Sequence, residues 1–177
     1  NFKKIIALFG ILFLLISCKT NPFTGKKTIA LVSNDQLFPS SFSQYNQVLS
    51  ESNVITGTTR SEMIKRVGER IAAASERYLN ANGYQGYLDD YKWEYKLIES
   101  EQVNAWCMPG GKIAFYTGIL PIADNETGIA AIMGHEVAHA LANHGQQRMS
   151  KGVIQQVGAA GVAIGTSGHS SEAQQAW

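Results

Sequence analysis

The feature that most constrains this chain is GHEVAHALANH, residues 134–144, in which two histidines lie four positions apart and a glutamate follows the first. On a helix of about 3.6 residues per turn, His135 and His139 project from one face, so both imidazoles can reach one metal ion. Glu136 is turned roughly 100° from His135, which leaves its carboxylate beside such an ion and able to hold a bound water. These three side chains can act together only if the segment is a helix.

The residues around this segment predict that helix. Asp124 is a suitable N-cap, and an apolar stripe at helical spacing continues to about Gly145. The stripe consists of Ile129, Ile132, Met133, Val137 and Leu141. Small side chains keep the helix slim enough to pack closely against another backbone and a metal; they are Gly134, Ala138, Ala140 and Ala142. The two histidines are therefore expected in the middle of the helix.

A zinc ion bound by this pair favours peptide hydrolysis as the chemistry. Zinc lowers the pKa of a bound water to about 7 and polarises a carbonyl, while a neighbouring carboxylate takes the proton and passes it to the leaving amine. Glu136 is placed to be that base. The same pattern also arises on helices whose histidines bind no metal, so from these residues alone a core or surface helix stays open as an interpretation.

Composition limits the class of protein. The 177 residues are 45% hydrophobic, which argues against disorder and is enough for one folded domain. The 15 basic and 14 acidic residues give a net charge of +1 with no long run of either sign. Nucleic acid is therefore not an expected partner.

The N-terminus has the features of a secretory signal. Two lysines precede an apolar run from Ile5 to Ile16, which is shorter than the roughly 20 residues that span a bilayer. Leu15-Ile16-Ser17-Cys18 resembles a bacterial lipobox. Residues 1–17 are therefore predicted to be a signal peptide, and Cys18 the lipidated residue that attaches the chain to a membrane. An ordinary signal peptide and an uncleaved anchor are the alternatives.

The rest of the chain alternates helical and strand patterns, which predicts an α+β fold. Residues 18–60 read as a lipid-anchored tether that leads into irregular structure, with room for one short helix. A helix is expected over residues 61–78, with Ser61 as its N-cap, and a half-buried strand over residues 91–97. A second strand, Lys112 to Tyr116, follows two glycines, and a weak helix begins near residue 152. Residues 61–177 therefore form the predicted domain.

Two separated motifs and the signal together resemble one known family. NAWCMPGGKIAFYTGIL, residues 104–120, and IAAIMGHEVAHALANHGQQRMS, residues 129–150, are similar to metallopeptidase family forty-eight, a family of gluzincins. NPFTGKKTIALVSNDQ, residues 21–36, is similar to the start of envelope lipoproteins of that family. The resemblance implies a zincin-like domain in which the active-site helix packs against a small sheet.

The resemblance also implies roles for particular residues. Zinc is the expected cofactor, with His135 and His139 as ligands and Glu136 as catalytic base. The strand over residues 112–116 is expected at the edge of the sheet, where its main chain pairs with an extended polypeptide substrate. The predicted substrate-binding residues are Gly110, Gly111, Lys112, Ile113 and Ala114, with Asn104 and Pro109 shaping the approach.

Three further residues bear on this site. The family's third zinc ligand is a glutamate on a later helix, and Glu172 lacks the aspartate that follows that ligand, so we expect the ligand beyond this sequence. His144 is expected at the surface near the helix end, turned away from the ligand face. Cys107 is left without a disulfide partner when Cys18 is lipidated. It is either a small buried hydrophobic residue or a thiolate that caps the zinc.

The sequence thus predicts a lipid-anchored zinc endopeptidase of the bacterial cell envelope that faces the periplasm. By resemblance its substrates are misfolded or misassembled envelope proteins, and Lys19 after the lipidated cysteine favours the outer membrane. A non-catalytic, chaperone-like assembly lipoprotein is the main alternative. A small-molecule metallohydrolase, which would need a closed apolar pocket, is a third class.

Overall fold

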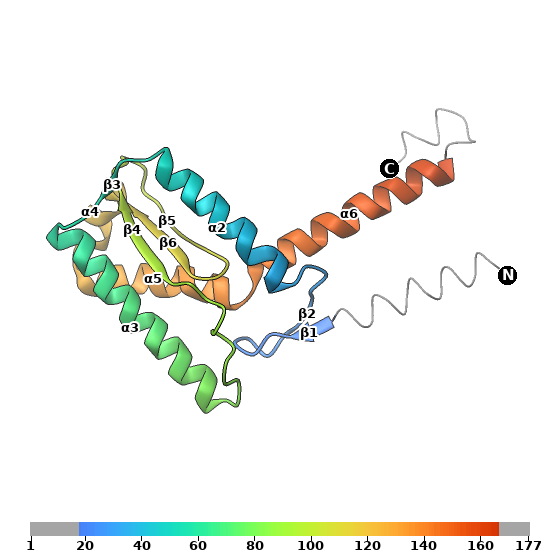
Figure 1. The fold of residues 1–177 in the computed structure, drawn as a ribbon, viewed down its shortest axis with the longest axis horizontal. Coiled ribbons are helices and arrows are strands. Elements are labelled where there is room, and N and C mark those ends of the chain that lie inside the picture. The colour runs from blue at the N-terminus through green and yellow to red at the C-terminus, as the bar shows by residue number, and fades with distance from the viewer. Residues whose placement is uncertain (1–17, 167–177) are drawn as a thin grey trace.

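A computed structural model describes residues 18–166, so the predicted signal peptide and Glu172 lie outside the described residues. Figure 1 shows the arrangement of the elements along the chain. In order, they are β1 (Cys18–Thr20), β2 (Lys27–Ile29), α2 (Asn34–Ser50), β3 (Val54–Ile55), α3 (Thr59–Ala81), β4 (Glu94–Ile98), β5 (Ala105–Met108), β6 (Lys112–Tyr116), the 3-10 turn η1 (Thr117–Ile119), α4 (Leu120–Ala123), α5 (Glu126–Leu141) and α6 (His144–Thr166).

The main sheet has four strands in the order β3-β4-β6-β5. β4 and β6 pair in parallel, with Glu94 opposite Lys112, whereas β3 and β5 pair antiparallel to their neighbours. β5 and β6 form a hairpin through the glycine turn at residues 110–111. The mixed α+β architecture predicted from the sequence is confirmed.

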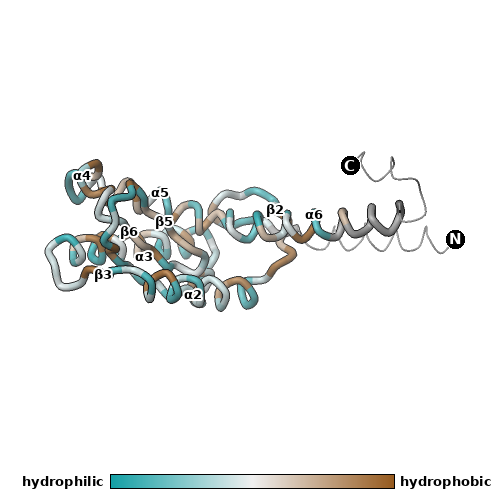
Figure 2. Tube along the Cα trace, turned by 90° about the horizontal axis from the view of Figure 1, so that it is seen from above, coloured by the Kyte–Doolittle hydropathy of each residue, from teal (hydrophilic) through white to brown (hydrophobic). Residues whose placement is uncertain are grey.

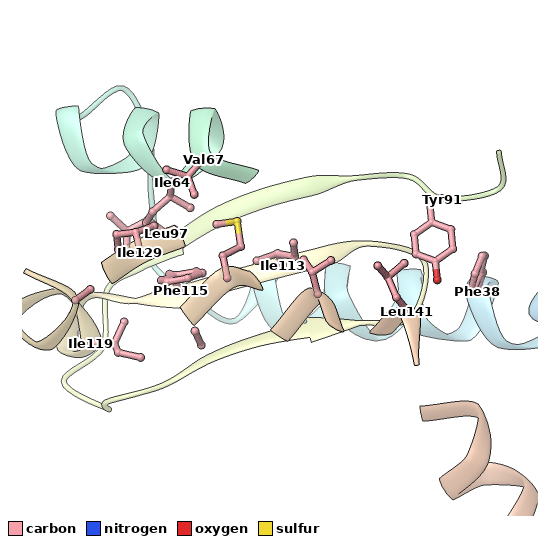
Figure 3. Close-up of a cluster of buried hydrophobic side chains, with 14 of the residues drawn as sticks. Phe38, Ile64, Val67, Tyr91, Leu97, Ile113, Phe115, Ile119, Ile129 and Leu141 are labelled. Carbon is pink, nitrogen blue, oxygen red and sulfur yellow. The ribbon is translucent and has the colours of Figure 1, made fainter. Parts of the chain in front are cut away.

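Helices cover both faces of this sheet. Ile113 and Phe115 of β6 point to one face, where they join a core cluster with Ile64 of α3 and Ile129 of α5 (Figure 3). Ala114, which alternates with them, lies in a second cluster with Tyr45 of α2 on the opposite face. The sheet is therefore the middle layer, between α2 on one side and α3 with α5 on the other.

Two elements lie outside these layers. β1 and β2 form a separate antiparallel hairpin, and α6 extends away from the layered body, as Figures 1 and 2 both show. α6 agrees in kind with the weak helix predicted near residue 152, but it begins earlier, at His144. No helix within residues 18–166 is both long and apolar enough to cross a membrane.

Several predicted boundaries shift. The helix predicted over residues 61–78 is α3, which begins at Thr59 because Thr58 is the N-cap and Ser61 takes the third helical position of a capping box. The short helix expected before residue 61 is α2, residues 34–50, which is longer than predicted. The apolar residues of α2 are sparse in sequence, yet Leu37, Phe38 and Tyr45 are buried.

The prediction that residues 112–116 form an edge strand is wrong. This strand is β6, and it is paired on both sides, by β4 and by β5. The edge belongs instead to β5, a strand of four residues, AWCM, that shows no clear alternation and so escaped prediction. The signal that could have located it is the hairpin pattern, since an apolar run before a glycine turn and a second strand favours antiparallel pairing.

The contact between α3 and β4 yields a stability prediction. A side chain at Gly68 of α3 would collide with the Tyr95 ring of β4, whereas a Cβ at Gly134 of α5 would meet no atom within 4 Å. We expect Gly68→Ala to destabilise the fold by about 1–3 kcal/mol through overpacking. Gly134→Ala should stabilise it by up to about 1 kcal/mol, because alanine favours helix. Urea unfolding measures both, and equal stability of the two variants would contradict this packing.

Candidate active site

The helix that carries the histidine pair is fixed by its cap and by its buried stripe. α5 begins after Asn125, whose side chain accepts hydrogen bonds from Thr127 N at 2.9 Å and Gly128 N at 3.2 Å. Asp124 is not the N-cap as predicted, because its φ of 62° places it in a tight turn one residue earlier. The residues that α5 buries against the sheet and its neighbours are Ile129, Met133, Val137, Ala140 and Leu141.

The opposite side of α5 presents the two histidines to solvent. His135 and His139 are exposed, and their Nε2 atoms lie 3.1 Å apart. Two nitrogens bound to one tetrahedral zinc at the usual bond length are separated by roughly 3.3 Å. The pair therefore fits a shared metal ion. The small residues around it do not all act as predicted, since Gly134 faces open space and contacts no other backbone.

The described residues supply this pair and no complete ligand set. Within residues 18–166 no group of three or more His, Cys, Asp or Glu side chains is placed to hold a metal ion. Zinc in proteins takes three or four protein ligands. The described residues accordingly bring two imidazoles together on α5, with Glu136 next to His135 in the sequence.

His144 lies against His139 of the histidine pair, contrary to the prediction that it turns away. The helix does not continue to Gly145: α5 ends at Leu141, Asn143 adopts a φ of 57°, and α6 begins at His144. This bend places His144 Nδ1 2.8 Å from His139 Nδ1. Partial burial lowers the pKa of His144, as do the positive charges of His139, Arg148 and Lys26. His144 thus contacts the ring nitrogen of His139 that faces away from His135.

Glu136 lies on the side of α5 that faces β5. Burial raises the pKa of the Cys107 thiol of β5, and the nearby negative charge of Glu136 raises it further. Cys107 packs against the main core cluster, and its Sγ donates a weak hydrogen bond to Met108 O at 3.5 Å. A thiol packed against the core in this way behaves as a small hydrophobic group. The structure therefore favours the small hydrophobic role for Cys107 over the thiolate cap.

The five predicted substrate-binding residues form the β5–β6 turn and the paired strand β6. Gly110 and Gly111 have φ values of 83° and 86°, and a Cβ at either would meet aromatic rings, those of Phe42 and Trp93. Their carbonyls accept hydrogen bonds from Lys92 N and Glu94 N. Since Ile113 and Ala114 are fully buried in a strand paired on both sides, they cannot pair with a substrate as predicted.

Lys112, the remaining member of that set, has a structural partner. Its buried Nζ donates to Glu94 Oε2 at 2.9 Å and lies 5.0 Å from the centre of the Phe42 ring. Burial alone would raise the pKa of Glu94, but hydrogen bonds and charges from Lys112 and Lys96 outweigh it and lower the pKa. Lys112 is thus held in an ion pair on the α2 side of the sheet, away from α5.

The open edge beside α5 is that of β5. Asn104 O accepts a hydrogen bond from Tyr116 N at 3.0 Å, which sets the alternation of the β5–β6 ladder. In an antiparallel pair every second residue points its main-chain N–H and C=O away from the partner strand. For β5 those residues are Ala105 and Cys107. Their peptide groups face an edge that no other strand within residues 18–166 occupies.

The packing of Cys107 yields a test. We expect Cys107→Ser to leave zinc affinity within about twofold of the wild type, because the thiol packs against the core cluster as a small hydrophobic group. His139→Ala is the matched positive control and should lower the affinity strongly. Zinc titration against a chelating dye measures both. If Cys107→Ser lowered the affinity as much as His139→Ala does, the result would support Cys107 as a thiolate ligand of the zinc.

Comparison with known proteins places the same helix in a protease family. Residues 58–176 match peptidase family M48. The mitochondrial metalloendopeptidase OMA1 of Schizosaccharomyces pombe is 36% identical over 87 residues, 49% of this chain and 23% of that protein. OMA1 of Saccharomyces cerevisiae is 42% identical over 69 residues, 38% of this chain and 20% of that protein. The beta-barrel assembly-enhancing protease of Yersinia pestis is 25% identical over 123 residues, 70% of this chain and 23% of that protein.

This chain spans about a quarter of the length of these relatives. The family match, in contrast, covers more than half of this chain and includes α3, the β5–β6 hairpin and the HEVAH helix. The resemblance inferred from the two motifs is thereby confirmed at the level of the family. The chain belongs to peptidase family M48.

Proposed function

We propose that this chain provides the core of a zinc metalloendopeptidase site, in which His135 and His139 hold the metal and Glu136 is the catalytic base. One observation carries the proposal: the Nε2 atoms of His135 and His139 lie 3.1 Å apart on the exposed side of α5, the Glu136 carboxylate follows His135, and α5 itself packs against β5, whose outer edge is unpaired among the described residues. Membership of a metallopeptidase family supports it.

Bound zinc supplies Lewis-acid chemistry, since it lowers the pKa of water and polarises a carbonyl. Glu136 takes a proton from the attacking water, whose oxygen bonds to the scissile carbonyl carbon. The carboxyl group then gives the proton to the leaving nitrogen as the C–N bond breaks. Helix geometry separates the base from the two ligands, because Glu136 is rotated roughly 100° from His135 and does not share a metal ion with the two histidines.

An extended polypeptide is the substrate that suits the open edge. The main-chain groups of Ala105 and Cys107 offer donors and acceptors at alternate positions, and an added strand satisfies them by β-augmentation. Because α5 packs against β5, such a strand would pass beside Glu136. Because this recognition uses the main chain, it selects unfolded segments and depends little on their side chains. The strand proposed to pair with the substrate is therefore β5, in place of β6.

We further propose an envelope location and substrates among misfolded or misassembled envelope proteins. The lipobox-like Cys18 supports a membrane anchor, and one relative is named a beta-barrel assembly-enhancing protease. Cys18 is three residues before Asn21, a buried residue. An anchor there would hold the folded domain within about 11 Å of the lipid attachment, given the reach of an extended chain.

The test compares two Glu→Gln substitutions on the same helix. Glu136→Gln should lower kcat for hydrolysis of an unfolded protein such as labelled casein by about 100-fold or more, because the base is lost. Zinc affinity should remain within about twofold of the wild type, since Glu136 is not proposed as a metal ligand. Glu126→Gln is the control, because Glu126 begins α5 and pairs at the surface with Arg66 and Arg70. It should leave hydrolysis unchanged.

The same pair of variants separates the protease from a chaperone-like lipoprotein. A binding factor that uses α5 only as a scaffold should keep its cellular role in the Glu136→Gln variant. Undiminished hydrolysis by Glu136→Gln would contradict the assigned base. A wild-type protein that has its complete set of zinc ligands, is loaded with zinc and cleaves no unfolded protein would contradict the protease itself.

A further inference from the structure

The polar residues that this fold buries are concentrated at one junction. Among the described residues, the buried polar or charged side chains are Asn21, Ser41, Lys112, Gln146 and Ser150. Three of them, Asn21, Gln146 and Ser150, lie where the N-terminal segment meets the bend between α5 and α6. Buried polar groups are stable only when hydrogen-bonded, so such a concentration specifies one geometry.

Asn21 forms a turn and reaches the end of the active-site helix. Its Oδ1 accepts hydrogen bonds from Phe23 N at 3.0 Å and from Thr24 N at 2.8 Å. Its Nδ2 donates to Leu141 O at 2.7 Å. Leu141 is the last residue of α5, where carbonyls lack partners within the helix. Asn21 is 2% exposed, so this contact is shielded from water.

The same N-terminal segment holds the beginning of α6. Gln146 Nε2 donates to Val32 O at 2.7 Å, and Leu31 N donates to Ser150 Oγ at 3.1 Å. Residues 21–32 therefore bind both sides of the α5–α6 bend, and Figure 1 shows the β1–β2 hairpin beside it. We call residues 21–32 the N-terminal clamp. It precedes residues 58–176, the part that matches the family.

The bend that the clamp holds brings His144 to His139. Metal-bound histidines generally have their second ring nitrogen hydrogen-bonded, which fixes the tautomer and the ring orientation. For His139 Nε2 to bind zinc, its Nδ1 has to carry the proton, and His144 Nδ1, 2.8 Å away, accepts it. His144 follows Leu141 by only three residues, so a change in the bend would separate the two rings.

We propose that Asn21 is a positioning residue for the metal centre. By binding Leu141 O it fixes the α5–α6 bend, and the bend keeps His144 on Nδ1 of His139 with Nε2 free for the metal. The proposal rests on the proposed function only in taking His139 as a zinc ligand. It assigns a role in the metal site to a segment that contributes no ligand.

The first test is Asn21→Asp, which keeps the size and the turn-forming oxygen but replaces the donor to Leu141 O. We expect zinc affinity to fall about tenfold, the lower end of the losses seen when partners of metal ligands are changed. Asn82→Asp is a control for the substitution itself, because Asn82 Nδ2 also donates to a helix carbonyl, Tyr78 O, at 2.7 Å, at an exposed position near the end of α3. This helix carries no proposed metal ligand, so the variant should leave zinc affinity unchanged. If Asn21→Asp does not fold, Gln146→Met removes the donor to Val32 O and should lower the affinity instead.

A double-mutant cycle separates positioning from general loss of structure. If Asn21 acts through His144, the double variant Asn21→Asp/His144→Phe should bind zinc as weakly as His144→Phe alone. Independent losses that multiply would overturn the proposal, as would an unchanged affinity in Asn21→Asp.

The tautomer of His139 can be measured without zinc. Nitrogen-15 NMR of the metal-free chain should show Nδ1 protonated in the wild type and in Asn82→Asp, and a mixture in Asn21→Asp. A mixture of tautomers already present in the wild type would contradict the proposed role of the clamp. A wild-type chain with the single tautomer but no zinc binding would contradict the proposed function and leave the clamp intact.

Discussion

Burial of one face of α5 is the constraint on which the rest of the structure depends. Met133, Val137 and Leu141 are almost fully buried, and each such side chain contributes about 1.5–3 kcal/mol relative to an exposed one. That burial fixes the rotation of the helix about its axis. His135 and His139 are then exposed on the opposite side, and Glu136 faces β5. The same packing thus stabilises the domain and orients the proposed reacting groups.

The sheet adds the second half of the proposed site through the open edge of β5, one of its two edge strands. β6 is the most buried strand, and it is held by β4, by β5 and by the hydrogen bond from Tyr45 of α2. β5 pairs on one side only among the described residues. The chain therefore places an unused row of peptide groups next to the helix that bears the histidines. Together, α5 and β5 define where an extended polypeptide would bind.

What the sequence could predict depended on how local the signal was. The HEVAH helix, α3 and β4 were predictable because their apolar residues recur at helical or strand spacing, and β6 because it is an apolar run that follows two glycines. β5 has four residues, too few for periodicity to identify, and this led to the wrong choice of edge strand. The position of His144 depends on the bend at Asn143, and the bend depends on Asn21, 120 residues from Leu141. Long-range hydrogen bonds of this kind leave no local pattern.

The central claim is that His135 and His139 together bind one zinc ion, and X-ray absorption at the zinc edge tests it most directly. In the zinc-loaded chain we expect two imidazole nitrogens at about 2.0–2.1 Å from the metal, with no sulfur at the distance of about 2.3 Å expected for a cysteine ligand. His139→Ala should reduce the imidazole contribution to one. A sulfur ligand, or an imidazole count that His139→Ala leaves unchanged, would contradict this account.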